Sequence, residues 1–308
     1  MSILVAGSVA LDSVETPFGT AERVIGGSGV FFSAAASLLC PVRLLGVVGD
    51  DYPFEKLDFL SERGVDLSGV EHAEGESFLW SGQYSDDLSS RDTLETRLGV
   101  FADFKPSVPE AFKDSRYVFL GNIDPVLQME VLDQMPEPAA VICDTMNYWI
   151  EGSREALLEL LHRVDILMVN DAEARQLSGD HNLPRAARWI QERGPRFVVV
   201  KKGEHGAMLF GPDWMFSVPG YPLAVVFDPT GAGDCFAGGF VGHMASVDSQ
   251  EPDVLRRAMV YGSVMGSYAV ESFSVDRFHS LDEAAIQGRM REFKEMTAFE
   301  LELEASDG

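Results

Sequence analysis

The segment Asp228–Phe240 contains the residues of this chain whose types and spacing best suit chemistry on an anion. It reads Asp-Pro-Thr-Gly-Ala-Gly-Asp-Cys-Phe-Ala-Gly-Gly-Phe. The apolar run Val225–Phe227 predicts a strand before it, and the glycines predict that a helix begins around Gly231–Gly233. Unpaired backbone N–H groups and the helix dipole favour an anion at such a helix start, and glycines let a ligand approach closely. The segment therefore predicts a phosphate-binding turn.

Asp234 is a carboxylate placed directly beside this predicted anion site. It is useful there if it accepts the proton of a hydroxyl that attacks the phosphorus, while the amides of Gly231, Ala232 and Gly233 stabilise charge on the transferred group. The alternative is a plain strand–turn–helix junction in which Asp234 caps the first turn. Further glycines inside a helix are costly, so we expect another part of the molecule to approach closely. These glycines are Gly238, Gly239 and Gly242.

The same segment closely resembles the second signature of the ribokinase-like (phosphofructokinase B) family of carbohydrate and nucleoside kinases. Other motifs in the expected order extend the resemblance from Ile3 to about Phe278. The resemblance implies an ATP-dependent kinase in which Asp234 is the catalytic base and Gly231–Gly233 form the anion hole. It also implies that Mg²⁺ bridges the phosphates and that a monovalent cation, usually K⁺, is bound by loops near Asp228 and Thr230 and after Ala269.

Asn170 and Glu173 follow the apolar run Val164–Val169, and their spacing predicts a capping box at the start of a helix. The resemblance gives the pair a second role, with Asn170 at the nucleotide and Glu173 holding magnesium through water. Such an arrangement suits an ion that is reluctant to lose its water ligands.

A loop rich in lysine and glycine follows the expected strand Phe197–Lys201 and reads Lys-Lys-Gly-Glu-His-Gly. Lysines and glycines at the end of a strand can receive phosphate oxygens, although a plain hairpin turn also explains them. Similar loops line the nucleotide site in the resembled family. The resemblance therefore assigns nucleotide contacts to Lys201, Gly203, Glu204 and Gly206.

Asp12 follows the first expected strand, where a carboxylate can accept hydrogen bonds from two neighbouring hydroxyls or simply cap a turn. Gly26–Gly29 resembles the family's first signature, but Phe31 stands where the ribose-type pattern has an asparagine. An acceptor that is flatter or less polar than ribose is therefore expected, such as a nucleoside or a cyclitol. The residues that we assign to the acceptor site are Asp12, Gly27, Ser28, Asn122 and Asn147.

Short apolar runs alternate with helical patterns, which is typical of a largely parallel sheet covered by helices on both faces. The expected strands are Ile3–Ala6, Val42–Gly46, Tyr117–Leu120, Ala140–Cys143, Ile166–Val169 and Phe197–Lys201. The expected helices are Val30–Leu39, Pro53–Arg63, Pro125–Gln134, Ser153–Arg163, Asp171–Leu177 and Pro184–Glu192. The sequence thus predicts an α/β fold, and the resemblance specifies a ribokinase-like three-layer αβα body.

Two regions, 12–24 and 77–104, interrupt this rhythm with strand-like pieces such as Phe78–Tyr84 and Thr96–Phe101. We expect them to form a small β-lid on a single kinase domain that spans residues 1–308. A lid that closes over the site would keep water away from the phosphate donor. Trp80 and Tyr84 alternate to one face of this lid, where they either close over the substrate or pack in the lid's own core.

The chain has 308 residues and a net charge of −25, which repels nucleic acid and anionic membranes, so neither is expected as a partner. Its acidity, with six lysines against eighteen arginines, fits either a high-salt habitat or simple solubility. The start Met1–Gly7 resembles a first strand rather than a signal peptide, and no apolar run reaches the roughly 20 residues of a membrane span. The acidic tail Glu300–Asp307 is expected to be solvated.

The three cysteines, Cys40, Cys143 and Cys235, have neither metal nor disulfide spacing. Buried thiols and a cytoplasmic protein are therefore expected. The sequence as a whole predicts an ATP-dependent kinase that phosphorylates a hydroxyl of a neutral, polyhydroxylated small molecule and forms a homodimer through the lid. The alternative is a non-catalytic ligand-binding regulator of the same fold, although such a protein has no use for a base beside an anion hole. A Rossmann dehydrogenase is disfavoured because no Gly-x-Gly-x-x-Gly follows the first strand.

Overall fold

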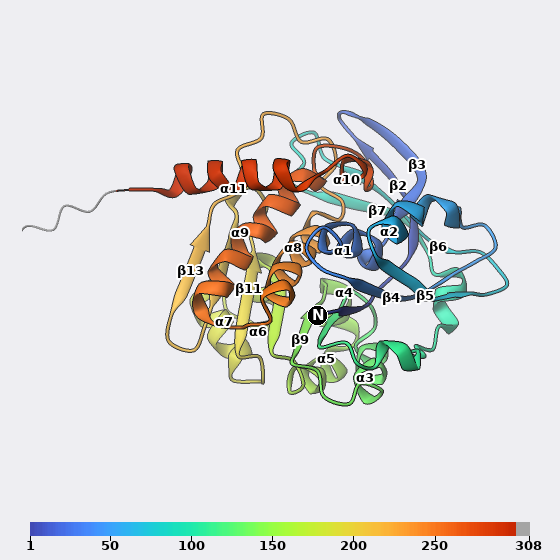
Figure 1. The fold of residues 1–308 in the computed structure, drawn as a ribbon, viewed down its shortest axis with the longest axis horizontal. Coiled ribbons are helices and arrows are strands. Elements are labelled where there is room, and N and C mark those ends of the chain that lie inside the picture. The colour runs from blue at the N-terminus through green and yellow to red at the C-terminus, as the bar shows by residue number, and fades with distance from the viewer. Residues whose placement is uncertain (300–308) are drawn as a thin grey trace, which may run out of the picture.

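A computed structural model describes residues 1–299, and the acidic tail expected at Glu300–Asp307 lies outside this range. The described residues form a nine-stranded sheet in the order β13-β12-β11-β10-β9-β8-β1-β4-β5 (Figure 1). Its strands are β1 Ile3–Ala6, β4 Val42–Val48, β5 Val65–His72, β8 Tyr117–Leu120, β9 Ala140–Asp144, β10 Ile166–Asn170, β11 Phe197–Lys201, β12 Ala207–Phe210 and β13 Met215–Val218.

The seven strands that lie between β11 and β5 in this spatial order, ends included, all run parallel to their neighbours. Strands β12 and β13 continue the sheet beyond β11 as antiparallel hairpins. Side chains alternate between the two faces along each strand. Ile3 and Val5 of β1 therefore join one buried apolar cluster, while Leu4 and Ala6 join the other. Because both faces are buried, the central strands are apolar throughout, and this explains why the sequence predicts them well.

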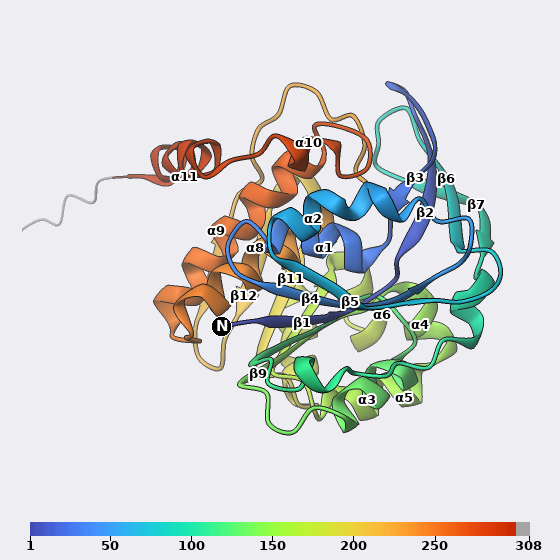
Figure 2. The ribbon, with the colours of Figure 1, turned by 45° about the vertical axis from the view of Figure 1, so that its right-hand side comes forward.

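Helices cover both faces of the sheet and give the predicted three-layer α/β fold, which is confirmed (Figures 1 and 2). The helices on the face of the first cluster are α1 Ser28–Ala36, α2 Asp58–Glu62, α8 Ala232–Val247, α9 Pro252–Ala269, α10 Asp276–His279 and α11 Glu283–Thr297. Those on the other face are α3 Pro125–Asp133, α4 Asn147–Gly152, α5 Arg154–Leu161, α6 Asp171–Ser178 and α7 Leu183–Gln191. Within residues 1–299, none of the helices is long and apolar enough to cross a membrane.

A second sheet of four strands, in the order β3-β2-β6-β7, lies on the right of Figure 2. Its strands are β2 Ala10–Thr16, β3 Gly19–Gly26, β6 Phe78–Tyr84 and β7 Arg91–Arg97. The strand expected at Thr96–Phe101 is wrong in position, because Gly99 has φ 52° and turns the chain into the short 3-10 helix η2 Gly99–Asp103. Strand β7 therefore lies earlier in the chain, at Arg91–Arg97.

Val225–Phe227, which we expected as a strand, is an irregular segment. Its contact with the body includes one backbone hydrogen bond, from the Phe227 amide to the Val270 carbonyl oxygen. Val225 and Phe227 are 43% and 39% exposed, so their apolar side chains do not mark a buried strand. A short apolar run is ambiguous without knowledge of the strand it would pair with.

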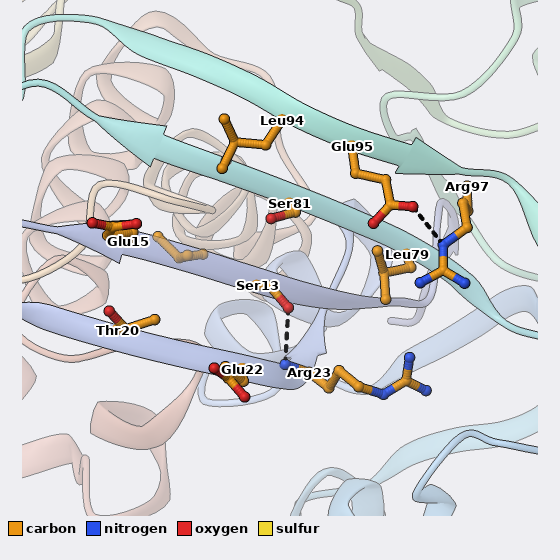
Figure 3. A pocket seen from close by; sticks show the side chains of 12 residues that line it. Ser13, Glu15, Thr20, Glu22, Arg23, Leu79, Ser81, Leu94, Glu95 and Arg97 are labelled. Atoms are coloured by element: carbon orange, nitrogen blue, oxygen red, sulfur yellow. Dashed lines mark hydrogen bonds and ion pairs between the residues drawn. The ribbon is translucent and has the colours of Figure 1, made fainter.

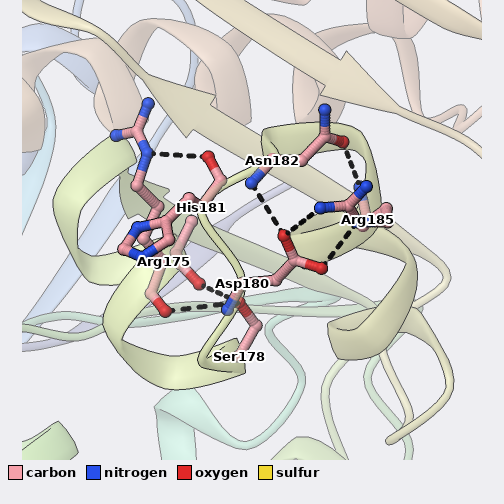
Figure 4. Close-up of polar contacts among 7 residues, drawn as sticks. Arg175, Ser178, Asp180, His181, Asn182 and Arg185 are labelled. Atoms are coloured by element: carbon pink, nitrogen blue, oxygen red, sulfur yellow. Dashed lines mark hydrogen bonds and ion pairs between the residues drawn. The ribbon is translucent and has the colours of Figure 1, made fainter.

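The connection between α6 and α7 is fixed by polar contacts around Asp180 (Figure 4). The Asp180 carboxylate accepts hydrogen bonds from Arg185 Nε at 2.7 Å and from the Asn182 backbone amide at 2.8 Å. The side chain of Asn182 in turn caps α7, while Gly179 ends α6 in the left-handed conformation. These contacts hold the C-terminal end of α6, whose first turn lies at the carboxyl edge of the sheet.

Helix α8 is packed closely on two sides, which confirms the expectation drawn from its glycines. A Cβ atom added at Gly238 would lie 2.5 Å from the Phe32 carbonyl oxygen of α1, and one at Gly239 would lie 2.6 Å from the Tyr261 carbonyl oxygen of α9. The two neighbouring helices thus fix the position of α8, and with it the turn Gly231–Gly233 at its start.

Gly238→Ala is expected to lower the free energy of unfolding by about 1–3 kcal/mol, because the added methyl group overpacks the contact with α1. Denaturant unfolding measures the effect. Gly288→Ala in α11 is the matched control, since an added Cβ meets no atom within 4 Å there and alanine is the better helix former. Equal stability changes in the two variants would contradict the close approach of α1 and α8.

Candidate active site

Three neighbouring strands end in polar residues at the carboxyl edge of the sheet. Asp144 ends β9, Asn170 ends β10 and Lys201 ends β11. The parallel register pairs Met168 with Asp144 and Asn170 with Lys201, so all three polar residues lie at the same edge. In open α/β sheets this edge is where ligands bind.

The turn at the start of α8 adjoins this edge. Gly231 is the N-cap residue with φ 74°, and an added Cβ would lie 2.3 Å from the Phe31 ring, so both backbone and space require glycine. In the described chain, the Ala232 amide donates to the Pro229 carbonyl oxygen, whereas the amides of Gly231 and Gly233 have no hydrogen-bond partner. Because no side chain caps the helix, these two amides are the donors that an anion would meet.

Phe31 packs in the core against the anion-binding turn, although we expected it to face the acceptor. Its side chain is 2% exposed, and its ring packs beneath Gly231. The residue therefore supports the anion-binding turn, and its substitution for asparagine does not by itself define the acceptor.

Lys201 reaches back from the end of β11 to Asp144 and to the start of α8. Its Nζ lies 2.6 Å from Asp144 Oδ2, and the two side chains are 16% and 6% exposed. The same Nζ lies 3.1 Å from the position of an added Cβ on Gly233. A largely buried ammonium group is thus placed against the turn that we expected to bind phosphate.

Asp234 lies in the first turn of α8 and is half-buried beside this ion pair. Burial, and then the negative charge of Asp144, raise the pKa of Asp234 to about 7, although Lys201 acts in the opposite direction. A carboxyl group with such a pKa is an effective proton acceptor near neutral pH, in contrast to an ordinary surface carboxylate.

The predicted capping box of α6 is present. The Asn170 side chain accepts a hydrogen bond from the Glu173 amide at 2.8 Å, and Glu173 accepts one from the Asn170 amide at 2.7 Å. Burial, and then the charge of Asp144, raise the pKa of Glu173 to about 7. This carboxyl group is therefore in a place where an added cation would be favourable.

The loop after β11 forms the short 3-10 helix η4 Gly203–His205 and leads into the antiparallel strand β12. Glu204 is exposed, while Gly203 and Gly206 have φ values of 54° and 82° that suit this tight connection. The Lys201 side chain points into the site, whereas the loop that follows it forms the hairpin turn that the sequence also allowed. The nucleotide contacts of the loop remain a prediction.

Asp12 of β2 is 5% exposed and lies against the backbone of Gly26 and Gly27. Burial, and then the charge of Asp228, raise the pKa of Asp12 to about 7, and the charge of Asp234 adds to the effect. Tyr52, which the sequence did not single out, has a buried hydroxyl with no hydrogen-bond partner in residues 1–299, and the charge of Asp12 acts on it. This hydroxyl therefore has hydrogen-bonding capacity that no described residue uses.

The other residues expected at the acceptor site are not brought together in this way. The Ser28 hydroxyl is hydrogen-bonded to the Ser8 amide at 3.1 Å and lies 3.2 Å from the Ser8 hydroxyl, so it joins the start of α1 to the loop after β1. The side-chain amide of Asn122 accepts a hydrogen bond from Trp149 Nε1 at 2.9 Å and donates to the sulfur of Met146. Asn147 is exposed at the start of α4.

The second sheet contacts the turn before α8. The Tyr84 hydroxyl of β6 lies 3.1 Å from Thr230 Oγ1, and the Thr230 amide donates to Asp228 Oδ1 at 2.8 Å. The guanidinium of Arg91 lies over the Trp80 ring at 4.8 Å, and its charge acts on Asp12 and Asp234. The face of this sheet that carries Tyr84 therefore looks onto the carboxyl groups of the site.

The fold and the site together define a small-molecule kinase of the α/β class. The chain belongs to the pfkB family of carbohydrate kinases, whose family model matches residues 6–278. This confirms the resemblance found in the sequence, and with it the prediction of an ATP-dependent small-molecule kinase.

Two curated relatives and two solved structures illustrate the similarity. A cytidine kinase of Thermococcus kodakarensis is 28% identical over 246 residues, which cover 78% of this chain and 87% of the relative. An inositol 3-kinase of Arabidopsis thaliana is 24% identical over 299 residues, covering 90% and 76%. A putative ribokinase II from E. coli has a TM-score of 0.79 at 19% identity, covering 94% of this chain and 99% of its own. The complex of that protein with ATP and Mg²⁺ has a TM-score of 0.77.

Glu173→Gln is expected to stabilise the protein at pH 8 by about 1–3 kcal/mol and to change its stability little at pH 4. The reason is that the raised pKa keeps the folded state protonated up to about pH 7, while the unfolded chain already loses this proton near pH 4.5. Stability attributable to Glu173 therefore falls as the pH rises from about 4.5 to 7, and glutamine, which keeps the capping hydrogen bond, removes this loss.

Denaturant unfolding at the two pH values measures the difference. Glu137→Gln, at an exposed position, is the matched control and should have little effect at either pH. An equal stability change for Glu173→Gln at pH 4 and pH 8 would contradict the prediction, because it would show that ionisation of Glu173 does not destabilise the folded protein.

Proposed function

We propose that the protein transfers the terminal phosphoryl group of ATP to a hydroxyl of a neutral, polyhydroxylated small molecule. The observation that carries this proposal is the half-buried Asp234, whose pKa is raised to about 7, beside the free amides of Gly231 and Gly233. A proton acceptor and an anion-binding turn are the two elements that phosphoryl transfer to a hydroxyl needs.

In this proposal Asp234 accepts the proton of the acceptor hydroxyl as its oxygen attacks the phosphorus. The amides of Gly231 and Gly233, with Ala232 completing the turn, face the transferred group. Asp12 binds neighbouring hydroxyls of the acceptor, because a carboxylate accepts hydrogen bonds from a diol without donating any. The buried hydroxyl of Tyr52 is then available to the same ligand.

Mg²⁺ and ATP fit the donor set at this edge. Glu173 is a carboxyl group whose pKa is raised by burial and by Asp144, so a bound cation would offset repulsion there. Glu173 would hold the ion through water, and the ion supplies charge neutralisation for the phosphates. Asn170, Lys201, Gly203, Glu204 and Gly206 form the nucleotide side of the site. We assign K⁺ to the loop of Asp228 and Thr230, where the buried Asp228 carboxylate provides oxygen ligands.

An uncharged acceptor is supported by the charges around Asp12. A phosphorylated acceptor needs several cations to neutralise its dianion. Arg97, one of two lid arginines that could serve, is paired with Glu76 at 3.1 Å and with Glu95 at 2.9 Å. Arg91 alone then faces Asp12, Asp228 and Asp234. The relatives named cytidine kinase and inositol 3-kinase favour a nucleoside or a cyclitol over a simple pentose.

The second sheet is proposed to act as the lid, with Tyr84 contacting Thr230 beside the anion-binding turn. The opposite face of this sheet is proposed as a homodimer interface (Figure 3). Ser13 and Ser81, paired in register, line a hollow of about 340 Å³ there, and Leu94 nearby is 60% exposed.

Cys40, Cys143 and Cys235 are buried free thiols, which supports a reducing, cytoplasmic location.

The test is turnover of ATP with a panel of nucleosides, cyclitols, sugars and sugar phosphates. A neutral acceptor should give the highest kcat/KM. Asp234→Asn should lower kcat for that acceptor by about 10²–10⁴-fold while leaving nucleotide affinity nearly unchanged, because the amide cannot accept the proton.

Asp213→Asn, at an exposed turn position, controls for the loss of one carboxylate and should keep normal turnover. Ligand-induced thermal shifts without turnover would favour the regulator instead. A sugar phosphate that exceeds every neutral acceptor tenfold in kcat/KM would overturn the assignment of an uncharged acceptor.

A further inference from the structure

Asp144 and Lys201 form a buried ion pair that joins two strands across a third. Asp144 ends β9, Lys201 ends β11, and β10 lies between them. Their 2.6 Å contact spans 57 positions of sequence. Apolar residues of similar size are often at least as stable in such places, so stability alone is a weak explanation for this pair.

Asp144 is itself held firmly. Its Oδ1 accepts a hydrogen bond from the Thr145 amide at 2.8 Å. Its carbonyl oxygen accepts one at 3.2 Å from the side chain of the buried Gln128, which also donates to the Gly121 carbonyl oxygen at 2.7 Å. The carboxylate is therefore fixed in place before any ligand arrives, which is the property of a group that orients another.

Lys201 has hydrogen-bonding capacity left after it pairs with Asp144. An ammonium group has three N–H donors, and within residues 1–299 Asp144 is the partner that its Nζ contacts. The Nζ lies beside Gly233, whose backbone amide is also without a partner. The spare N–H groups are thus next to the place where a phosphoryl group would bind.

We propose that Asp144 is a positioning residue that holds the Lys201 ammonium against the start of α8, where Lys201 contacts the phosphoryl group during its transfer. The inference rests on the proposed kinase activity and deepens it, because it specifies that Lys201, on the nucleotide side of the site, contacts the phosphoryl group that is transferred. Asp144 also keeps the lysine from pairing directly with Asp234. Such a pair would stop the Asp234 carboxylate from accepting a proton.

The reaction balances without the transfer of a proton to or from Asp144 or Lys201. The acceptor oxygen forms a bond to the γ-phosphorus, and its proton moves to Asp234. The bond between the γ-phosphorus and the β–γ bridging oxygen breaks, and ADP leaves with that electron pair. Lys201 stays an ammonium and Asp144 stays a carboxylate, so the two contribute only position and charge.

The experiment compares Lys201→Met, Asp144→Asn and the double variant in steady-state kinetics with ATP and the best acceptor of the wild-type protein. Lys201→Met should lower kcat by about 10²–10³-fold while the KM for ATP changes less than about threefold, because the contact strengthens only in the transition state. Asp144→Asn should lower kcat by about tenfold or more in the wild-type background. In the Lys201→Met background it should add less than about twofold, since it acts through the lysine.

The pH dependence of kcat gives a second readout that a merely structural role would not produce. Removing the negative charge of Asp144 should shift the acid limb to lower pH, while removing the positive charge of Lys201 should shift it to higher pH. Shifts in the same direction, or none in either variant, would contradict the proposal.

The exposed ion pair of Lys113 and Glu110 provides matched controls, and Lys113→Met and Glu110→Gln should leave every parameter unchanged. A Lys201→Met variant with normal kcat and a raised KM for ATP would overturn the proposal, because Lys201 would then contact the nucleotide only in its ground state. If a single variant fails to fold, the double variant carries the test, because it leaves no buried charge unpaired. Near-normal kcat in that double variant would also overturn it. Failure of the proposed function is a separate result, seen as a wild-type protein that turns over no acceptor.

Discussion

The withdrawal from water of carboxyl groups that also repel one another is the constraint on which the rest of this site depends. Asp12, Glu173 and Asp234 each have a pKa raised to about 7 by burial, and a neighbouring carboxylate is the next cause in each case. Such a cluster opposes folding when it ionises, and bound cations or hydroxyl groups relieve it. The same interactions that destabilise the free protein thus prepare it to bind its substrates.

The scaffold supplies the stability that this cluster removes. Parallel strands buried on both faces place their ends at one edge, and helix α8 is held between α1 and α9 by contacts that leave no space for side chains at Gly238 and Gly239. Rigid support matters because amides that bind a reacting phosphoryl group must be in position before the reaction begins. The second sheet, by contrast, meets the site through contacts such as that of Tyr84 with Thr230, which a moving lid could break and remake.

The sequence predicts those parts of the structure that depend on local pattern. Ile3–Ala6 and Phe197–Lys201 are strands with the expected ends, because a buried strand is apolar throughout, and the start of α8 is marked by its own glycines. The pairing of Asp144 with Lys201 could not be predicted, since it depends on the order of strands in space. Ser28 was expected at the substrate because Gly26–Gly29 resembles the family's first signature, but its hydroxyl contacts Ser8, which comes from a separate loop. Tyr52 has no motif around it, so only its burial beside Asp12 draws attention to it.

Titration of the carboxyl carbons by NMR, comparing the ligand-free protein with Asp234→Asn, tests the central claim most directly. The claim is that a buried carboxyl group at the anion-binding turn keeps its proton until near neutral pH. The account predicts that a resonance present in the wild-type protein and lost in the variant titrates near pH 7. A titration of that resonance near pH 4, as for an exposed aspartate, would contradict it.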